Sequence, residues 1–379
     1  MTHQVRLFTI AILRTRATIV SFWLLLGVGF SVYLADPDTY LHSPFNVGDW
    51  VINYQAGFVR RGFIGEVLYQ LARVSNVNIG FLAVYLQIIL LIGIGSVVTY
   101  FALRSTSAWL PWIVLSPVGF LYATYNGDGG YRKELLLFSV LAMLALATRV
   151  TTRRAHLLLW LSLLTFVVTV LSWEPAVVTL PCIWWLCHAN TQNQLPVKRF
   201  QWAFLTTGLV GLALASLFHG NAAQSQQICH SVLTLGGSHP SVCQGALAEL
   251  SVTPHQQLST LASFFPRYLW YGVFLLLALL PFALSGWFKE NKRIALSVLA
   301  STSLLYVIGT DYGRWIHLQA TCLAFLFLVR NNSSSGVKIA WGLERVALTL
   351  WVVAWSVPYS FNPLIWQGLV IGAWHKVVH

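Results

Sequence analysis

The sequence predicts an all-α fold, a polytopic transmembrane helical bundle of about 11–12 spans with an interfacial helix after the first external loop. The first observation is compositional: 57% of the 379 residues are hydrophobic and 9% are charged, with a mean hydropathy of +0.68. Soluble domains carry roughly 25% charged residues. The second is that apolar runs of roughly 17 to 25 residues recur, long enough as helices to cross a hydrocarbon core of about 30 Å. The runs are uniformly apolar rather than alternating, which favours helices over an outer-membrane barrel.

The apolar runs place the expected spans in order along one integral membrane domain, residues 1–379. The first run has no small-residue cleavage site after it, so it reads as a retained helix rather than a removed signal peptide. The longest connection between spans is the loop 219–262. The expected spans lie near residues 18–35, 79–103, 109–124, 135–148, 156–172, 176–188, 201–218, 268–287, 294–309, 315–329 and 341–357, with a last apolar segment at 364–374.

Charge distribution predicts which loops lie on which side of the membrane. Arg6, Arg14 and Arg16 precede the first span, and the positive-inside rule then puts the N-terminus in the cytoplasm. With alternating spans, all eleven acidic residues except Glu290 and Glu344 fall outside. A topology wrong by one span would mix these two sets. We therefore expect a multi-pass protein of the bacterial cytoplasmic (inner) membrane, with any active site on the extracytoplasmic face.

The first outside loop holds the segment "GFVRRGFIGE", preceded by Asp49. From residue 62 to 73 the apolar residues follow one helical face and Glu66 lies on the opposite one, which predicts a short amphipathic helix in the interface. The paired Arg60 and Arg61 at its N-terminus suit the binding of a diphosphate, because guanidinium groups present forked donors to phosphate oxygens. The alternative is that both arginines reach lipid headgroups or pair with Asp49 and Glu66.

The second outside cluster is "YNGDGGYRKE", which contains three glycines around Asp128. Turn chemistry alone explains the first part of this segment as well as ligand binding does. It does not explain Arg132, Lys133 and Glu134 at the mouth of an apolar span. These three residues, with Asp128, are predicted to form part of the wall of a polar site.

The last two outside clusters are smaller. Glu174 in "LSWEP" sits at a turn between two spans, and either pairs with an arginine of another cluster or has a raised pKa and handles protons. Asp311 and Arg314 in "GTDYGRW" are three residues apart, so a local ion pair on one helical face competes with a role in substrate binding.

Cofactor and metal signals are weak. Cys229 and Cys243 both fall in the 219–262 loop, where an oxidising compartment permits a disulfide. The histidines of that loop match no metal-ligand spacing, and no nucleotide-binding loop or zinc-protease motif occurs. We expect no cofactor and no bound ATP, and the sequence does not indicate whether a divalent cation takes part.

With "GFVRRGFIGE", "YRKE", "WE" and "DYGRW" all outside, the sequence resembles bacterial membrane proteins linked to surface-polysaccharide gene clusters. It is more loosely similar to the GT-C glycosyltransferases and the O-antigen polymerases. The resemblance implies a glycosyltransferase or polysaccharide polymerase that uses polyprenyl-(di)phosphate-linked sugars. It implies as partners a polyprenyl-linked saccharide, membrane lipids and other envelope polysaccharide-assembly proteins. The chain lacks the Asp-Glu or Asp-x-Asp pair of GT-C enzymes in its first outside loop, which leaves the base unassigned.

The residues fit this chemistry independently, since glycosyl transfer needs a carboxylate to take a hydroxyl proton and cations to stabilise a departing phosphate. Asp49 and Glu174 are the candidate catalytic carboxylates. A transporter or flippase of a lipid-linked or anionic solute is the main alternative, although its polar residues would lie nearer the bilayer midplane. A non-catalytic envelope scaffold is a third. The dispersed positive charge does not indicate nucleic-acid binding.

Overall fold

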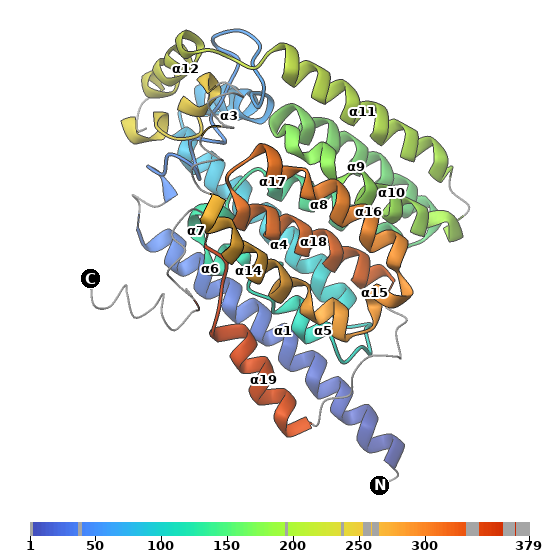
Figure 1. Ribbon diagram of the computed structural model, residues 1–379. Helices are drawn as coiled ribbons and strands as arrows, with labels where there is room; N and C mark the ends of the chain where they lie inside the picture. Colours follow the sequence, from blue (N-terminus) through green and yellow to red (C-terminus); the bar gives the residue numbers. More distant parts are fainter. Residues whose placement is uncertain are drawn as a thin grey trace.

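The computed structural model of the protein is a bundle of helices of very unequal length (Figure 1). It describes residues 3–36, 40–193, 196–235, 239–252, 259, 265–330, 341–358 and 368. Within these ranges the structure contains no β-strand, which confirms the predicted all-α class. The elements are α1 (His3–Ala35), α3 (Phe63–Ser75), α4 (Ile79–Ala102), α5 (Leu110–Val114), α6 (Tyr122–Tyr125), α7 (Gly127–Gly130), α8 (Glu134–Ala147), α9 (Thr152–Ser172), η1 (Glu174–Thr179), α10 (Leu180–Ala189), η2 (Asn190–Asn193), α11 (Val197–Leu217), α12 (Ala222–Thr234), η3 (Pro240–Cys243), η4 (Ala248–Ser251), α14 (Phe265–Leu284), α15 (Trp287–Glu290), α16 (Lys292–Ser303), α17 (Leu305–Ile308), α18 (Tyr312–Val329) and α19 (Trp341–Val353).

Four helices of the described part are long and apolar enough to cross a membrane, namely α1, α4, α9 and α11. They correspond to the predicted spans at 18–35, 79–103, 156–172 and 201–218. Two further predicted spans, 135–148 and 268–287, are the shorter apolar helices α8 and α14. The protein is therefore a multi-pass membrane protein whose remaining segments are short or interrupted.

The centre of the bundle is formed by α8 and α18. Every residue of α18 from Tyr312 to Leu328 is buried, and α8 is buried on almost all sides. A helix that is apolar around its whole circumference must be surrounded by other elements. Here α8 packs against α4, α9, α10 and α18, while α18 also packs against α14 and α16. The N-termini of these two central helices carry Glu134 and Arg314, which places charged groups next to each other inside the protein.

The predicted span 109–124 is not a continuous helix, and this expectation was wrong. The segment contains α5 and α6, separated by a non-helical stretch, and then α7. Proline lacks the N–H that an interior helical bond needs, and the sequence has Pro117 followed by Gly119. The helix therefore cannot continue through this region. Such backbone is tolerated at membrane depth when protein surrounds it, and residues 109–123 are all buried.

This broken segment runs along α1 from Arg14 to Tyr33. Near its start the Ala108 carbonyl accepts a hydrogen bond from Arg14, further along Thr124 donates to the Leu25 carbonyl at 3.3 Å, and at its end Tyr131 stacks on Tyr33. The backbones approach closely in the middle, because a Cβ at Gly29 would lie 2.9 Å from the Cα of Thr124. The segment thus crosses from one end of the bundle to the other without a regular helix.

Two other predicted spans are also interrupted. The span at 294–309 is divided into α16 and α17, and the span at 176–188 begins as the 3₁₀-helix η1 before α10. The span at 341–357 is helical to Val353 as α19, and residues 355–358 have no regular secondary structure. The predicted segment 364–374, apart from Gly368, lies outside the described residues.

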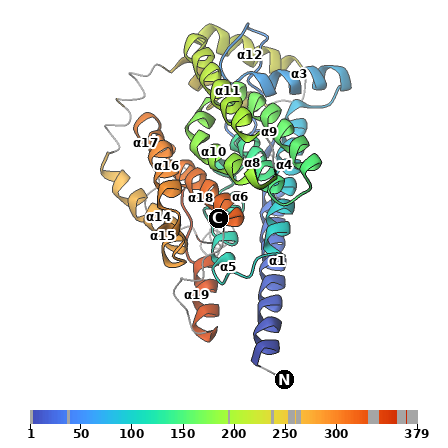
Figure 2. The same ribbon diagram turned by 90° about the vertical axis from the view of Figure 1, so that its right-hand side faces the viewer.

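Several segments that the charges assign to inside loops meet at one end of the bundle. Arg14 bonds to Ala108 and Glu344, and Arg149 donates to the carbonyl of Val329, so the predicted inside loops meet at the end where α1 begins. The predicted outside segments lie at the opposite end, where α3 and α12 lie across the top of the bundle in Figure 2. We call this second end the lid end.

Candidate functional site

The site is organised around residues 131–134, the "YRKE" segment that begins α8. The Tyr131 ring stacks on Tyr33 with centroids 3.7 Å apart, and the Trp50 indole N–H donates to the Tyr131 carbonyl at 3.0 Å. Both contacts are buried. They hold the first turn of α8 against α1 and the loop 40–51, so the next three charged side chains have defined directions.

Asp49 lies between Arg132 and Lys133 inside the protein. Its carboxylate oxygens are 3.5 Å from Arg132 Nε and 3.6 Å from Lys133 Nζ. The Asp49 side chain is 2% exposed and that of Lys133 is completely buried. Burial by itself would raise the pKa of Asp49, but Lys133 and Arg132 outweigh it and bring the pKa to about 2. Burial lowers the pKa of Lys133 to about 8, against the opposing effect of Asp49.

Lys133 also joins this pair to the arginines that precede α3. Its Nζ donates a hydrogen bond of 2.8 Å to the backbone carbonyl of Arg61. Arg61 has a left-handed backbone with φ of 67°, a conformation that costs a non-glycine residue roughly 1–2 kcal/mol. The Lys133 bond on one side and the ion pair of the Arg61 side chain on the other compensate for this cost.

The side chain of Arg61 forms a two-point ion pair with Glu174. Arg61 Nε lies 2.8 and 2.9 Å from the two carboxylate oxygens, and Nη2 lies 2.7 Å from Oε1. Arg60 Nη1 is 3.5 Å from the same oxygen. Burial would raise the pKa of Glu174, yet Arg61 and then Arg60 bring the pKa down to about 2. Of the two roles the sequence left open for Glu174, the structure shows the pairing with an arginine from another cluster.

The third part of the site joins the two central helices. Arg314 at the start of α18 donates from Nε to Glu134 Oε1 at 2.7 Å, and from Nη1 to Asp311 Oδ2 at 2.5 Å. The local Asp311–Arg314 pair that the sequence suggested is therefore present. The Arg314 guanidinium also bonds to Glu134, and these two residues are 180 positions apart in the chain.

These contacts form two groups, and the groups meet at Lys133 and Glu134, which are adjacent in the chain. Together they bring all four charged clusters of the sequence to one place. We call the whole set the charged network; it consists of Asp49, Arg60, Arg61, Arg132, Lys133, Glu134, Glu174, Asp311 and Arg314. It lies at the lid end of the bundle, at the N-termini of α3, η1, α8 and α18 (Figure 1).

Two of the predicted substrate-binding residues lie outside this network. Glu66 accepts hydrogen bonds from the Tyr54 backbone N–H and from the side-chain amides of Gln55 and Gln70 at 2.6 to 3.1 Å. It therefore holds the 54–55 turn against α3 and does not neutralise the paired arginines. Asp128 is exposed on α7, where the side chain of Asn126 caps Gly129 as turn chemistry predicts.

The network has one accessible edge. The side chains of Arg60, Arg61 and Glu174 are 21%, 24% and 14% exposed. By contrast, the Arg132, Lys133, Glu134 and Arg314 side chains are 6% exposed or less. Asp311 is 27% exposed, but the cation that it contacts, Arg314, is 5% exposed. An anion from outside therefore cannot reach a cation at this point. A ligand that approaches from outside would meet Arg60, Arg61 and Glu174 first.

The 219–262 loop covers this end of the molecule through residues 219–235 and 239–252, while its parts at 236–238, 253–258 and 260–262 lie outside the described residues. Cys229 and Cys243 form the predicted disulfide, which joins α12 to η3. Ser231 pairs with the Asn53 side chain at 3.1 Å, and Ser241 donates to the His42 carbonyl at 2.5 Å. Ile228, Leu247 and Leu250 pack against Ile52 and Val59 as a separate apolar cluster. The described part of the loop is therefore a disulfide-linked lid that packs on the segment carrying Asp49 and Arg60.

The lid contributes a charged residue that sequence reasoning missed. Burial raises the pKa of Glu249 in η4, an effect that Asp311 reinforces and that Arg61 and Arg60 oppose. Glu249 therefore lies within electrostatic reach of the accessible edge. The only signal in the sequence was that it is an outside acid, since it has no charged neighbours in the chain.

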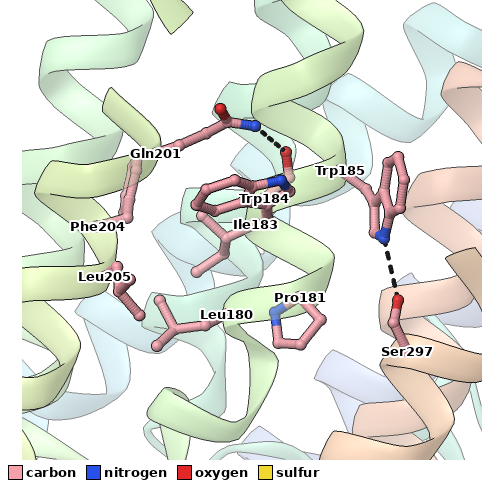
Figure 3. A pocket seen from close by; sticks show the side chains of 9 residues that line it. All are labelled: Leu180, Pro181, Ile183, Trp184, Trp185, Gln201, Phe204, Leu205 and Ser297. Atoms are coloured by element: carbon pink, nitrogen blue, oxygen red, sulfur yellow. Dashed lines mark hydrogen bonds between the residues drawn. The ribbon is translucent and has the colours of Figure 1, made fainter. Parts of the chain in front are cut away.

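A separate apolar cavity of about 290 Å³ lies between α10, α11 and α16 (Figure 3). Its walls include Leu180, Trp184, Phe204 and Leu205, and the Gln201 amide is turned to the Trp184 carbonyl. The cavity contains none of the predicted site residues. Its lining suits hydrocarbon rather than a charged headgroup.

The described residues include no group of three or more His, Cys, Asp or Glu side chains placed to hold a metal ion. The sequence pattern of a protein family described as "Uncharacterised membrane protein Rv1490" matches residues 14–256, more than half of the chain. No curated protein and no solved structure matches this chain. The matched range contains the lid cysteines and the whole network except Asp311 and Arg314.

Proposed function

The chain belongs to this family of membrane proteins, and from that premise we propose that it is a glycosyltransferase or polysaccharide polymerase. It would act on polyprenyl-(di)phosphate-linked sugars at the extracytoplasmic face of the bacterial inner membrane, during assembly of a surface polysaccharide. The observation that carries the proposal is the charged network. Five cationic and four acidic side chains from segments far apart in the sequence meet at one end of an otherwise apolar bundle.

The charges are of the two kinds that glycosyl transfer requires. The acceptor hydroxyl oxygen forms a bond to the anomeric carbon and loses its proton to a carboxylate. The bond from the anomeric carbon to the phosphate oxygen breaks, and its electron pair leaves with the lipid phosphate. Arg60 and Arg61 would stabilise that developing negative charge, because they are the accessible cations of the network. Forked guanidinium donors match phosphate oxygens in geometry as well as charge.

The two candidate carboxylates are placed differently for this chemistry. Asp49 is 2% exposed and lies against Arg132 and Lys133, so it is suited to holding these cations in position. Glu174 is 14% exposed and lies beside the proposed phosphate site. Glu174 is therefore the better-placed acceptor for the hydroxyl proton.

The lipid tail of such a substrate would leave the site alongside α3. This helix buries Ile64, Leu68 and Ala72, while Val67 and Leu71 on its outer side are 41% and 53% exposed. An exposed apolar face on a helix that lies across the end of the bundle (Figure 2) suits contact with acyl chains at the membrane interface.

The test is an assay of the purified protein with a polyprenyl-diphosphate oligosaccharide, in which product length is followed by gel or mass spectrometry. The double variant Arg60→Ala, Arg61→Ala should lose at least about a hundredfold in rate, the scale seen when a transition-state donor is removed. Asp49→Asn should also abolish transfer, because it disturbs Arg132 and Lys133 together.

The matched control is Arg73→Ala, which removes an exposed arginine from the last turn of the same α3 helix. This variant should form product at the native rate. An unchanged product ladder in the Arg60, Arg61 double variant would exclude the phosphate clamp.

A transporter or flippase remains the second candidate because of the broken segment 109–131. Interrupted crossing segments surrounded by protein are typical of transporters, which use the exposed backbone groups to bind solutes. Reconstituted vesicles separate the two functions. A flippase would move labelled lipid-linked saccharide across the bilayer without changing its length, whereas the enzyme would lengthen or transfer it.

A further inference from the structure

The Glu174 carboxylate lies where the proposed function places a substrate phosphate. Arg61 donates to both of its oxygens, and Arg60 lies 3.5 Å from one of them. Guanidinium groups bind carboxylate and phosphate with the same two-point geometry. A phosphate that takes the same two-point edge of Arg61 must therefore displace Glu174.

Glu174 is also the carboxylate that pairs with the accessible arginines of the network. Its side chain is 14% exposed, whereas those of Asp49 and Glu134 are 2% and 3% exposed. Asp311 is more exposed, but the guanidinium that it contacts is held by Glu134 as well. An incoming anion can thus exchange with Glu174 without breaking the buried part of the network.

We propose that Glu174 is a built-in competitor of the substrate phosphate, and that phosphate binding to Arg60 and Arg61 releases this carboxylate as the base. The inference rests on the proposed function and specifies how its site becomes active. While Arg61 holds Glu174, the pKa of about 2 makes the carboxylate too weak a base for a hydroxyl proton. After displacement, partial burial and the neighbouring anion both raise the pKa of Glu174. The base then exists only when the donor is in place.

The surroundings of Glu174 support this change. Among the described residues, the charged side chains that act on it are Arg61 and Arg60, with Lys133 at the start of α8. The helices α9, α10, α11 and α16 also pack against η1. The charged residues of α9, α11 and α16 lie in their first turns, and α10 has none apart from His188 in its last turn. Each of these groups is at the far end of its helix from η1. Once Arg60 and Arg61 are engaged elsewhere, Lys133 is the cation that still acts on Glu174, and the acidic Glu249 lies on the lid side of the same edge.

Calorimetry with inorganic pyrophosphate tests the proposal on the purified full-length protein. Titrations at pH 7 in two buffers of different ionisation enthalpy give both the affinity and the number of protons taken up per bound pyrophosphate. The native protein should take up more protons than Glu174→Gln, by a fraction of one proton, because a base whose pKa rises to near the working pH stays partly ionised. Glu174→Gln should bind pyrophosphate about tenfold more tightly or better, since no carboxylate has to be displaced.

The control is Glu290→Gln, which neutralises an exposed carboxylate on α15 and should reproduce the native affinity and proton count. Infrared difference spectra of the native protein provide a measurement that does not depend on a variant. Pyrophosphate should shift the carboxylate stretching bands as Glu174 loses its arginine partners, and unchanged bands would overturn the proposal.

The outcomes also separate this inference from the proposed function. Equal affinity and equal proton uptake in the native protein and Glu174→Gln would overturn the competitor role while leaving the phosphate clamp intact. Failure of both proteins to bind pyrophosphate would overturn the clamp and the inference together.

Discussion

Lys133 illustrates how a single side chain can join distant parts of the chain. Its ammonium group contacts the Asp49 carboxylate and the Arg61 carbonyl, and none of its surface is exposed. The charge of Asp49 is tolerated in the interior because Lys133 and Arg132 lie against it. The same lysine holds the Arg61 backbone in its left-handed conformation, so the buried half of the network positions the accessible half.

The ion pair of Glu174 predicts a loss of stability in acid. The folded-state pKa of about 2 lies below the ordinary value of 4.5, so the unfolded chain binds more protons between these two values. The stability that the pair contributes is therefore present above about pH 4.5 and is lost as the pH falls towards 2. Thermal unfolding in detergent should show a lower midpoint at each step of acidification.

Glu174→Gln should flatten this pH dependence, because glutamine does not titrate, whereas Glu290→Gln should leave it unchanged. If the Glu174→Gln midpoint falls with pH as steeply as the native one, the pair makes no contribution to folding stability.

At the scale of the element, α3 is placed by close packing at its first turn. Gly65 faces the backbone of the first outside loop, and a Cβ at this position would lie 1.9 Å from the Ile52 carbonyl oxygen. The Ile64 N–H donates to Ser172 at 3.0 Å, which joins the same turn to the end of α9. Arg60 and Arg61 precede this turn directly, so their positions depend on how closely α3 approaches the loop.

Gly65→Ala should therefore displace α3 and cost about 1–3 kcal/mol or more in unfolding free energy, the scale of overpacking in a close-packed interior. Activity should fall with it. Gly93→Ala in α4 is the matched control, because no atom lies within 4 Å of its added Cβ. That variant should be neutral or gain up to about 1 kcal/mol from helix propensity. Equal effects of the two substitutions on the unfolding midpoint would contradict this account of α3.

At the scale of the whole molecule, the lid and the bundle are stabilised differently. The bundle has a continuous apolar core, whereas the apolar cluster beneath the lid is small and a disulfide staples the lid. The cysteines are 14 residues apart, and closing a loop of this size contributes about 3 kcal/mol by chain entropy.

Replacing Cys229 and Cys243 by serine should therefore increase proteolysis and amide exchange in residues 222–252 while α8 and α18 stay protected. A reducing agent should have the same effect on the native protein and none on the double variant. Unchanged protection of the lid in the variant would show that its packing on the first outside loop is sufficient.

The two ends of the bundle also predict sidedness. Gln226 is exposed on the lid, and Thr106 is exposed beside the end where α1 begins. A membrane-impermeant thiol reagent added to intact cells should label Gln226→Cys and should label Thr106→Cys only after the cells are opened. The reverse pattern would put the charged network on the cytoplasmic side and exclude an extracytoplasmic active site.

Much of this organisation could be predicted from the sequence, because it follows from local composition. Long apolar runs identify α1, α4, α9 and α11, and the lid cysteines were paired from their shared loop. The charged segments were recognised for the same reason, since a charge in an apolar chain is conspicuous wherever it occurs. The break in the predicted span 109–124 was missed because its residues are as apolar as those of a helix, and Pro117 and Gly119 change the backbone without changing hydropathy.

What the tertiary structure decided is which charges pair. The partners Asp49 and Lys133, Arg61 and Glu174, and Glu134 and Arg314 are separated by 84, 113 and 180 residues (133 − 49, 174 − 61 and 314 − 134). Their pairing depends on how whole helices pack, and no local pattern encodes it. The sequence therefore determined that this is a membrane bundle and which of its segments carry charge. Only the packing determined that Glu174, rather than Glu66, holds the paired arginines.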